Sequence, residues 1–173
     1  MNLSKPIFLI GYRGTGKSAV ARELAAHLRF ESIDADEVVE HRAGKSIAEI
    51  FAEDGEAAFR ELESRVVADL CGKGSAVIAL GGGAVLREEN RAAIAAAGPV
   101  IWLTASVDII SARLAADDVT ASRRPNLTAA GGWAEIEALL AERTPIYRAC
   151  ATLVVDTEGK TPAEVADEIV AQL

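Results

Sequence analysis

The residues best suited to chemistry form one glycine-rich segment near the start of the chain, Gly11-Tyr12-Arg13-Gly14-Thr15-Gly16-Lys17-Ser18. The segment fits G-x-x-x-x-G-K-[ST], the P-loop, whose backbone N–H groups surround phosphate oxygens. In this pattern Lys17 reaches the β- and γ-phosphates of a nucleotide, and the Ser18 hydroxyl ligates Mg²⁺. The predicted nucleotide-binding residues of this segment are Gly14, Thr15, Gly16, Lys17, Ser18 and Ala19.

The segments on either side of the P-loop have the types that the motif requires. The apolar run 7–10 reads as a buried strand, and residues 19–28 read as a helix. A strand–loop–helix arrangement directs the loop N–H groups and the helix N-terminus at a bound anion. This context disfavours the alternative, a plain glycine-rich turn in which Lys17 is solvated.

Two further clusters, Asp34 with Asp36 and Gly81-Gly82-Gly83, each follow a predicted strand. Ligands of open α/β sheets bind at the carboxyl ends of the strands, so both clusters are predicted to lie near the transferring phosphate. The two carboxylates suit Mg²⁺ and the reacting groups, although either could instead cap the helix that begins near Glu37. The glycines permit close approach of a small substrate to the backbone, but a flexible turn is the alternative.

Four arginines lie in separate predicted elements of an otherwise acidic chain: Arg13, Arg60, Arg124 and Arg143. Each one alone is most simply a solvated or salt-bridged surface residue. Together they could form a cationic pocket, because the planar guanidinium group matches the geometry of carboxylates and phosphates.

Short apolar runs alternate with helical patterns along the whole chain. Continuous runs of this kind are typical of parallel strands covered on both faces, so the sequence predicts one α/β domain over residues 1–173, a three-layer sandwich. The predicted strands are residues 7–10, 32–33, 77–80, 100–103 and 153–155. The predicted helices include residues 19–28, 56–71, 88–97, 107–116 and 133–147, and two more that open at Ser46-x-x-Glu49 and Thr161-Pro162-x-Glu164.

Residues 117–132 interrupt this alternation. The segment is polar, contains Arg123-Arg124-Pro125 and ends in Gly131-Gly132. It is too long for an ordinary connection between two elements. It is predicted to be either a mobile lid that closes over the nucleotide or a plain surface loop, and composition alone favours neither.

Overall composition limits the partners of the chain. Its 173 residues carry a net charge of −8, which argues against nucleic acid or an anionic membrane as a partner. No apolar run reaches transmembrane length, and the N-terminus lacks a signal-peptide pattern, so a cytoplasmic location is predicted. Cys71 and Cys150 are too few and too isolated for a zinc site or a disulfide framework.

With these motifs in this order, the chain resembles the shikimate kinases over essentially its whole length. The P-loop is shared by very many nucleotide-binding proteins, and the other similar segments are more specific. They are DAD at 34–36, SIAEIFAEDGEAAFRELE at 46–63, GGGAV at 81–85, RPNLT at 124–128 and ERTPIYRACA at 142–151. The resemblance implies a nucleoside-monophosphate-kinase type of fold, with a five-stranded parallel sheet of order 2-3-1-4-5 and substrate-binding helices at about 35–65.

The resemblance also implies an activity, the ATP-dependent phosphorylation of the 3-hydroxyl of shikimate by a monomeric enzyme. Arg60 and Arg143 are then expected to bind the carboxylate of shikimate, with Gly82 beside them. Asp36 is expected to bind the ring hydroxyls and to act as the base or the hydroxyl-orienting group. Lys17 and Arg124 are expected to stabilise the charge of the moving phosphoryl group.

The same resemblance assigns the remaining binding roles. Ser18 and Asp34 are expected to organise Mg²⁺, with Asp34 acting through water. Arg113 and Pro162 lie at positions similar to those that hold adenine in the family. Arg13 receives no role, because the family varies at that position.

The sequence is also compatible, to different degrees, with three functions other than that of a shikimate kinase. A kinase for another carboxylated polyol, such as gluconate, is only partly disfavoured, since gluconate would also suit Arg60 and Arg143. A GTP-binding switch is disfavoured because the guanine-reading motif Asn-Lys-x-Asp is absent from the sequence. A nucleotide-binding module without catalysis is disfavoured by the intact set Lys17, Ser18, Asp34 and Asp36.

Overall fold

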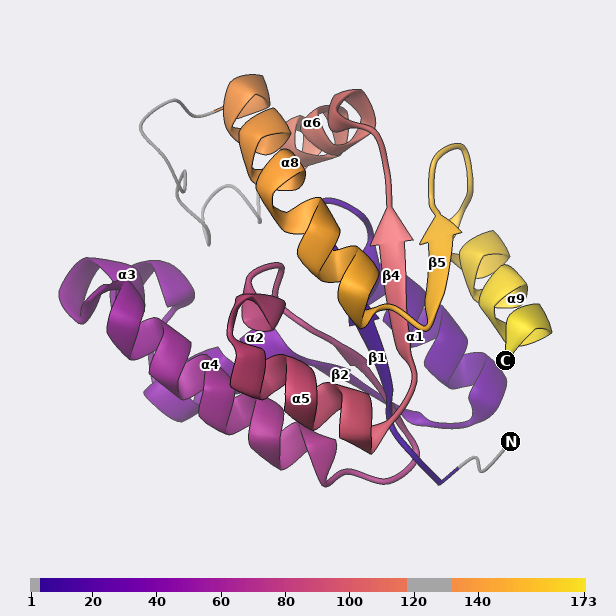
Figure 1. Ribbon diagram of the computed structural model, residues 1–173, viewed down its shortest axis with the longest axis horizontal. Helices are drawn as coiled ribbons and strands as arrows, with labels where there is room; N and C mark the ends of the chain where they lie inside the picture. Colours follow the sequence, from indigo (N-terminus) through magenta and orange to yellow (C-terminus); the bar gives the residue numbers. More distant parts are fainter. Residues whose placement is uncertain (1–3, 118–131) are drawn as a thin grey trace.

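The computed structural model describes residues 4–117 and 132–173 (Figure 1). Five parallel strands form one sheet in the order β2-β3-β1-β4-β5, which confirms the predicted order. The strands are β1 (Ile7–Ile10), β2 (Glu31–Asp34), β3 (Ala76–Ala79), β4 (Val100–Thr104) and β5 (Leu153–Asp156). Strand β2 is one residue longer at each end than the predicted strand 32–33. Its exposed first residue, Glu31, pairs with Ala76 of β3, and its last residue, Asp34, pairs with Ala79.

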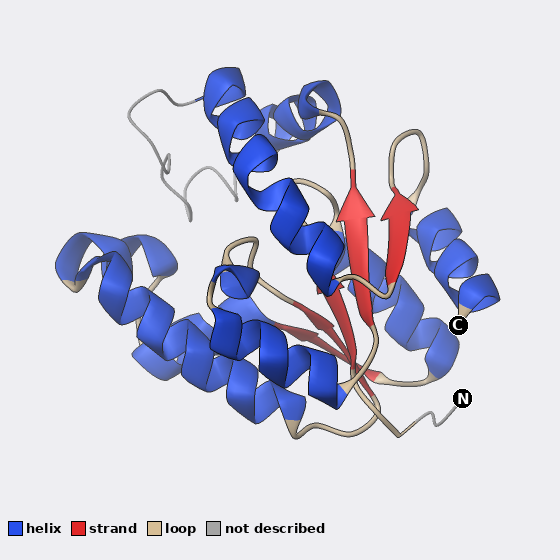
Figure 2. Cartoon of the chain, viewed as in Figure 1, coloured by secondary structure: helices blue, strands red, loops and turns tan. Residues whose placement is uncertain are grey.

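Helices cover both faces of the sheet, as the three-layer prediction requires (Figure 2). Successive strand residues point to opposite faces, so Leu9 and Phe8 belong to different cores. On the Leu9 face pack α1 (Lys17–Leu28) and α9 (Pro162–Gln172). The Phe8 face is covered by α2 (Ala35–Ala43), α3 (Ile47–Glu53), α4 (Gly55–Cys71), α5 (Glu88–Ala97) and part of α8 (Gly132–Cys150).

Beyond the carboxyl end of β4, α6 (Val107–Ala116) lies beside the N-terminal half of α8 (Figure 1). Tyr12 of the P-loop packs between them with Ile110 and Ile136. A single 3₁₀ turn, η1 (Ala84–Leu86), follows the glycine cluster and was not anticipated. The packing of α6 and α8 on Tyr12 therefore ties both helices to the P-loop.

Local signals at the helix ends are confirmed. Ser46 and Glu49 form a capping box at α3, and Thr161 and Glu164 form another at α9, where Pro162 is the first helical residue. Each such cap stabilises its helix by about 1 kcal/mol because it satisfies backbone N–H groups that the helix leaves unpaired. No helix in residues 4–117 and 132–173 is both long and apolar enough to cross a bilayer.

The sheet brings the two glycine-rich loops together. β1 and β3 are neighbours, with Leu9 paired to Ala79, so the P-loop and the glycine cluster Gly81-Gly82-Gly83 leave the same edge of the sheet side by side. The N–H of Leu80 continues the pairing by donating to the carbonyl of Leu9 at 3.0 Å. Both loops are thus held at the carboxyl ends of adjacent central strands, where open α/β sheets bind ligands.

Candidate active site

The P-loop connects β1 to α1 through glycines in a backbone region that other residues rarely adopt. Gly11, Gly14 and Gly16 have φ values of 140°, 83° and 90°. Lys17 is only 8% exposed, and its ammonium group donates hydrogen bonds to the carbonyls of Gly11 and Tyr12 at 2.9 and 3.0 Å. The ammonium group of Lys17 therefore lies against the P-loop, whose backbone N–H groups suit a bound phosphate.

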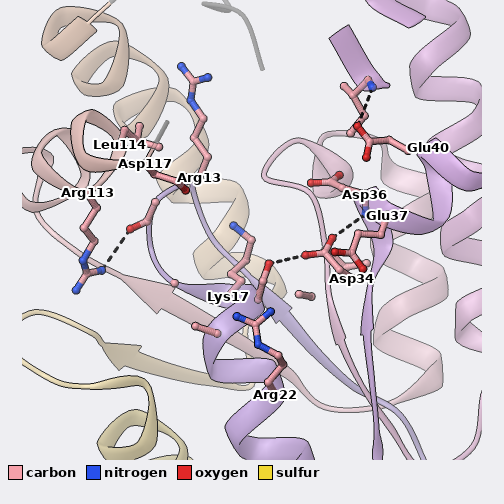
Figure 3. A pocket seen from close by; sticks show the side chains of 17 residues that line it. Arg13, Lys17, Arg22, Asp34, Asp36, Glu37, Glu40, Arg113, Leu114 and Asp117 are labelled. Carbon is pink, nitrogen blue, oxygen red and sulfur yellow. Dashed lines mark hydrogen bonds between the residues drawn. The ribbon is translucent and has the colours of Figure 1, made fainter. Parts of the chain in front are cut away.

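A cavity of about 380 Å³ opens beside this loop, and we call it the P-loop cavity (Figure 3). Its polar side chains come from the P-loop, from α1, from the end of β2 with α2, and from α6. The principal lining residues are Arg13, Gly14, Gly16, Lys17, Ser18, Ala19, Arg22, Asp34, Asp36, Glu37, Glu40 and Arg113. Thr15 is buried instead, and its hydroxyl donates to the carbonyl of Tyr12 at 2.8 Å, so its side chain shapes the loop.

Ser18 and Asp34 meet at the floor of the P-loop cavity. The Ser18 hydroxyl donates to Oδ2 of Asp34 at 2.5 Å, and Oδ1 of Asp34 accepts from the backbone N–H of Asp36 at 3.0 Å. The second bond makes Asp34 the N-cap of α2. The sequence analysis treats helix capping and a role at the phosphate site as alternatives for these carboxylates. Asp34 combines the two, because it caps α2 and also contacts Ser18.

The pair Ser18 and Asp34 offers a hydroxyl and a carboxylate to a metal. Such hard oxygen ligands suit Mg²⁺, which commonly takes one or two protein ligands and completes its shell with water and substrate phosphates. Within residues 4–117 and 132–173 there is no group of three or more His, Cys, Asp or Glu side chains arranged to hold a metal by themselves. The donor set therefore fits Mg²⁺ held jointly with a nucleotide.

A second cavity of about 340 Å³ lies next to the first, and we call it the arginine cavity. Arg60 of α4 and Arg143 of α8 both line it, although they are 83 residues apart in the sequence. The glycine cluster forms another part of the wall, and a Cβ on Gly83 would collide with the guanidinium of Arg60. The predicted substrate residues Asp36, Arg60, Gly82 and Arg143 are thus brought to one cavity.

Glu63 is a buried carboxylate in the arginine cavity that the sequence analysis missed. It is 4% exposed, and its Oε2 accepts a hydrogen bond of 2.7 Å from Nη1 of Arg60. Burial raises the pKa of Glu63, and the positive charge of Arg60 opposes that rise. The spacing of three residues between Arg60 and Glu63 on a predicted helix is a signal for this pair, since such residues face each other.

Asp36 and Arg13 line both cavities. The carboxylate expected to orient an acceptor hydroxyl therefore lies where the two cavities adjoin. Arg13, which had no predicted role, forms an ion pair of 2.9 Å with Glu135, a fully buried residue near the start of α8. This pair connects the P-loop to the helix that carries Arg143.

The other predicted binding residues, Arg113, Pro162 and Arg124, lie apart from one another in the sequence. Arg113 lines the P-loop cavity and donates to the carbonyl of Gly14 at 3.3 Å and to the hydroxyl of Thr157 at 2.9 Å. Pro162 begins α9 and does not line either cavity in the described part of the chain. Arg124 and nearly all of the predicted lid, 117–132, lie outside the described residues.

Comparisons with known proteins agree with this geometry. The family model for shikimate kinase matches residues 13–173. A shikimate kinase of Rhodopirellula baltica is 45% identical over 163 residues, which cover 94% of this chain and 87% of that protein. A shikimate kinase of Thermobifida fusca is 43% identical over 171 residues, covering 98% of this chain and 96% of the relative.

Solved structures give the same result. A shikimate kinase from Acinetobacter baumannii in complex with shikimate superposes with a TM-score of 0.92 at 30% identity, covering 99% of this chain and 93% of the other. A gluconokinase from Sinorhizobium meliloti superposes with a TM-score of 0.56 at 14% identity, a likeness of fold alone. The family model, the identities and the shared architecture together place this chain in the shikimate kinase family.

Proposed function

We propose that this chain transfers the γ-phosphoryl group of ATP to the 3-hydroxyl of shikimate. The observation that carries the proposal is the pair of adjoining cavities. One is built around a P-loop with a buried Lys17, and the other presents two arginines from different helices. Asp36 belongs to both cavities, so an acceptor in the second would be held beside a nucleotide in the first.

Arg60 and Arg143 provide the acceptor contacts. Two guanidinium groups in one cavity suit a carboxylate, because the planar N–H groups can donate two parallel hydrogen bonds. Glu63 restrains Arg60 through Nη1, and Glu56 lies 3.6 Å from its Nε, so Nη2 is the donor group of Arg60 that we assign to the substrate. Asp36 accepts a hydrogen bond from the attacking hydroxyl and so aligns its oxygen with the γ-phosphorus.

Lys17 provides the main protein charge on the donor side. Phosphoryl transfer spreads negative charge over the equatorial oxygens, and catalysis comes mostly from positioning and from offsetting that charge. From the family resemblance we also assign Arg124 to this task, and Arg113 with Pro162 to the adenine. Ser18 and Asp34 would hold Mg²⁺, which would supply further positive charge to offset that of the phosphates.

A coupled assay of ADP release tests the proposal. The purified chain is given ATP and Mg²⁺ with shikimate, quinate, gluconate or no acceptor, and the product is identified by mass spectrometry. We expect rapid turnover with shikimate alone and a single added phosphate on it. Equal turnover with gluconate would support the polyol-kinase alternative instead.

Because one chain supplies both arginines and the P-loop, we expect the active species to elute as a monomer in size-exclusion chromatography.

A further inference from the structure

Tyr147 lies outside both cavities but contacts the backbone that forms a wall of the arginine cavity. Its hydroxyl donates a hydrogen bond of 2.5 Å to the carbonyl oxygen of Gly82. The side chain is fully buried, one helical turn after Arg143 on α8. Gly82 and Arg143 both line the arginine cavity, whereas Tyr147 does not. Tyr147 therefore supports the wall from behind.

The bond to Tyr147 sets the direction of a peptide group in this wall. A trans peptide is planar, and its C=O and N–H bonds point in opposite directions. All described peptides are trans, so the carbonyl of Gly82 faces Tyr147 and the N–H of Gly83 faces away from it. A carbonyl oxygen turned into the cavity would repel the carboxylate of a bound acceptor. The hydrogen bond keeps that oxygen out of the cavity.

The P-loop also lies close to Gly82. A Cβ built on Gly82 would lie 3.3 Å from the carbonyl oxygen of Gly11, 3.5 Å from the backbone nitrogen of Arg13 and 3.6 Å from the Tyr147 hydroxyl. The glycine is therefore held between α8 and the loop that binds phosphate.

The environment of Tyr147 suits a permanent hydrogen-bond donor. Burial raises the pKa of its hydroxyl to about 12, although Arg143 opposes that rise. The hydroxyl is thus protonated at neutral pH and can donate a hydrogen bond. Its ring packs against the indole of Trp102 on β4, with 5.8 Å between the ring centroids.

We infer that Tyr147 is a positioning residue for the acceptor, which it serves by fixing the Gly82 carbonyl and the face of α8 that carries Arg143. This inference rests on the proposed function, since the acceptor is taken to be shikimate. Removing the hydroxyl leaves a buried carbonyl without its donor and frees the Gly82–Gly83 peptide to rotate. Acceptor binding then weakens, while the nucleotide, bound in the other cavity, is unaffected.

The test is Tyr147→Phe, which keeps the ring and its packing on Trp102. Calorimetric titration of the full chain with shikimate, without nucleotide, is expected to give a Kd about tenfold weaker than wild type. The KM for shikimate should rise in parallel, and the Kd for ATP should change by less than about twofold. Trp102→Phe is the matched control, because it loosens the same core and leaves the Gly82 hydrogen bond intact. It should lower the Tm without changing shikimate affinity.

Two outcomes would overturn the inference. The first is unchanged shikimate affinity in folded Tyr147→Phe. The second is a loss of affinity that is shared by Trp102→Phe, or that affects ATP equally, since general loosening would then explain it. If wild type itself neither binds nor phosphorylates shikimate, the proposed function fails, and that failure is visible before any variant is made.

Discussion

Arg60 and Glu63 form a hydrogen-bonded ion pair of 2.7 Å within the arginine cavity, and both side chains are nearly buried. The pair holds the guanidinium in one orientation before any acceptor arrives. It also places a negative charge close to the acceptor carboxylate, which weakens the attraction that Arg60 would otherwise exert. Arg143, drawn from a different helix, supplies the additional positive charge that the acceptor needs.

The raised pKa of Glu63 predicts a particular dependence of stability on pH. Between the ordinary value of 4.5 and the higher value in the folded state, the folded protein binds more protons than the unfolded chain. The contribution of Glu63 to stability is therefore lost as pH rises through that window. Glu63→Gln removes this effect, so the variant should become steadily more stable relative to wild type as pH increases from 4.5.

Urea unfolding at a series of pH values measures this difference. Glu61→Gln is the control, since Glu61 is exposed on the same helix and Arg87 lowers its pKa. For Glu61 the sign is opposite and the window lies below pH 4.5, because wild type gains stability over that variant as pH rises from the lowered folded-state pKa to 4.5, and the difference is constant above it. Parallel stability curves for wild type and Glu63→Gln would show that the buried carboxyl titrates normally.

The sheet and its loops could be predicted from the sequence because each depends on local patterns. The run 7–10 and the glycines of the P-loop specify a buried strand and a phosphate loop, and Ser46 with Glu49 marks a helix start. Arg60 and Arg143 could be assigned to one site only through the family resemblance. Nothing in their spacing indicates that α4 and α8 meet across the glycine cluster.

The contacts that the sequence analysis missed depend on tertiary packing. Glu63 is buried where the glycine cluster lies against α4, and a Cβ on Gly81 would be 3.0 Å from its Oε1. The bond from Tyr147 to Gly82 joins residues that are 65 positions apart. Asp34 could be recognised as a cap or as a site residue, but only the contact with Ser18 shows that it is both.

Acceptor recognition should depend on the shape of the two arginines as well as their charge. Arg60→Lys and Arg143→Lys each keep the charge but lose the planar pair of donors. Each should raise the KM for shikimate strongly, which corresponds to a loss of up to about 2–5 kcal/mol of acceptor binding. The KM for ATP should stay nearly unchanged. Steady-state kinetics with either substrate varied gives both values.

Arg65→Lys is the matched control for these variants, because Arg65 lies on the same helix with a side chain that is 70% exposed. It should behave as wild type. Shikimate carboxamide provides a second check, since a neutral amide cannot form the ion pair. Phosphorylation of the amide as fast as of shikimate would contradict the carboxylate clamp.

Lys17 should be essential for turnover and dispensable for folding. Lys17→Ala removes the cation that the P-loop holds at its carbonyls, and so removes charge stabilisation from the transferring phosphoryl group. A loss of roughly two or more orders of magnitude in kcat is expected. Lys73→Ala, at a half-exposed surface lysine paired with Glu31, serves as the control. Near-normal turnover of folded Lys17→Ala would remove the residue from the mechanism.

Arg124 should act on the chemical step. On the prediction that residues 117–132 form a lid, Arg124 would reach the nucleotide only on closure, so Arg124→Ala should lower kcat more than it weakens ATP binding. Pre-steady-state rates combined with equilibrium ATP titration separate the two effects. Arg123→Ala, at the adjacent arginine, is the control and should retain most of the activity. A fall in ATP affinity with unchanged kcat would mean that the segment only retains nucleotide.

The two roles of Asp34 can be separated by choosing the substitution. Asparagine caps helices about as well as aspartate, so Asp34→Asn should keep the stability of α2 while removing the charge beside Ser18. Asp34→Ala should lose about 1 kcal/mol of stability in addition, because the N–H of Asp36 loses its acceptor. Thermal unfolding of the three proteins measures the capping role.

The metal role of Asp34 is measured by titrating activity with Mg²⁺. A carboxylate that orients metal-bound water typically contributes about 10- to 100-fold in metal affinity or activity. Asp34→Asn should therefore require at least about tenfold more Mg²⁺ for half-maximal rate, at an unchanged Tm and an unchanged Kd for shikimate. An Mg²⁺ dependence identical to that of wild type would limit the role of Asp34 to capping α2. Ser18 would then be the one proposed metal ligand that remains.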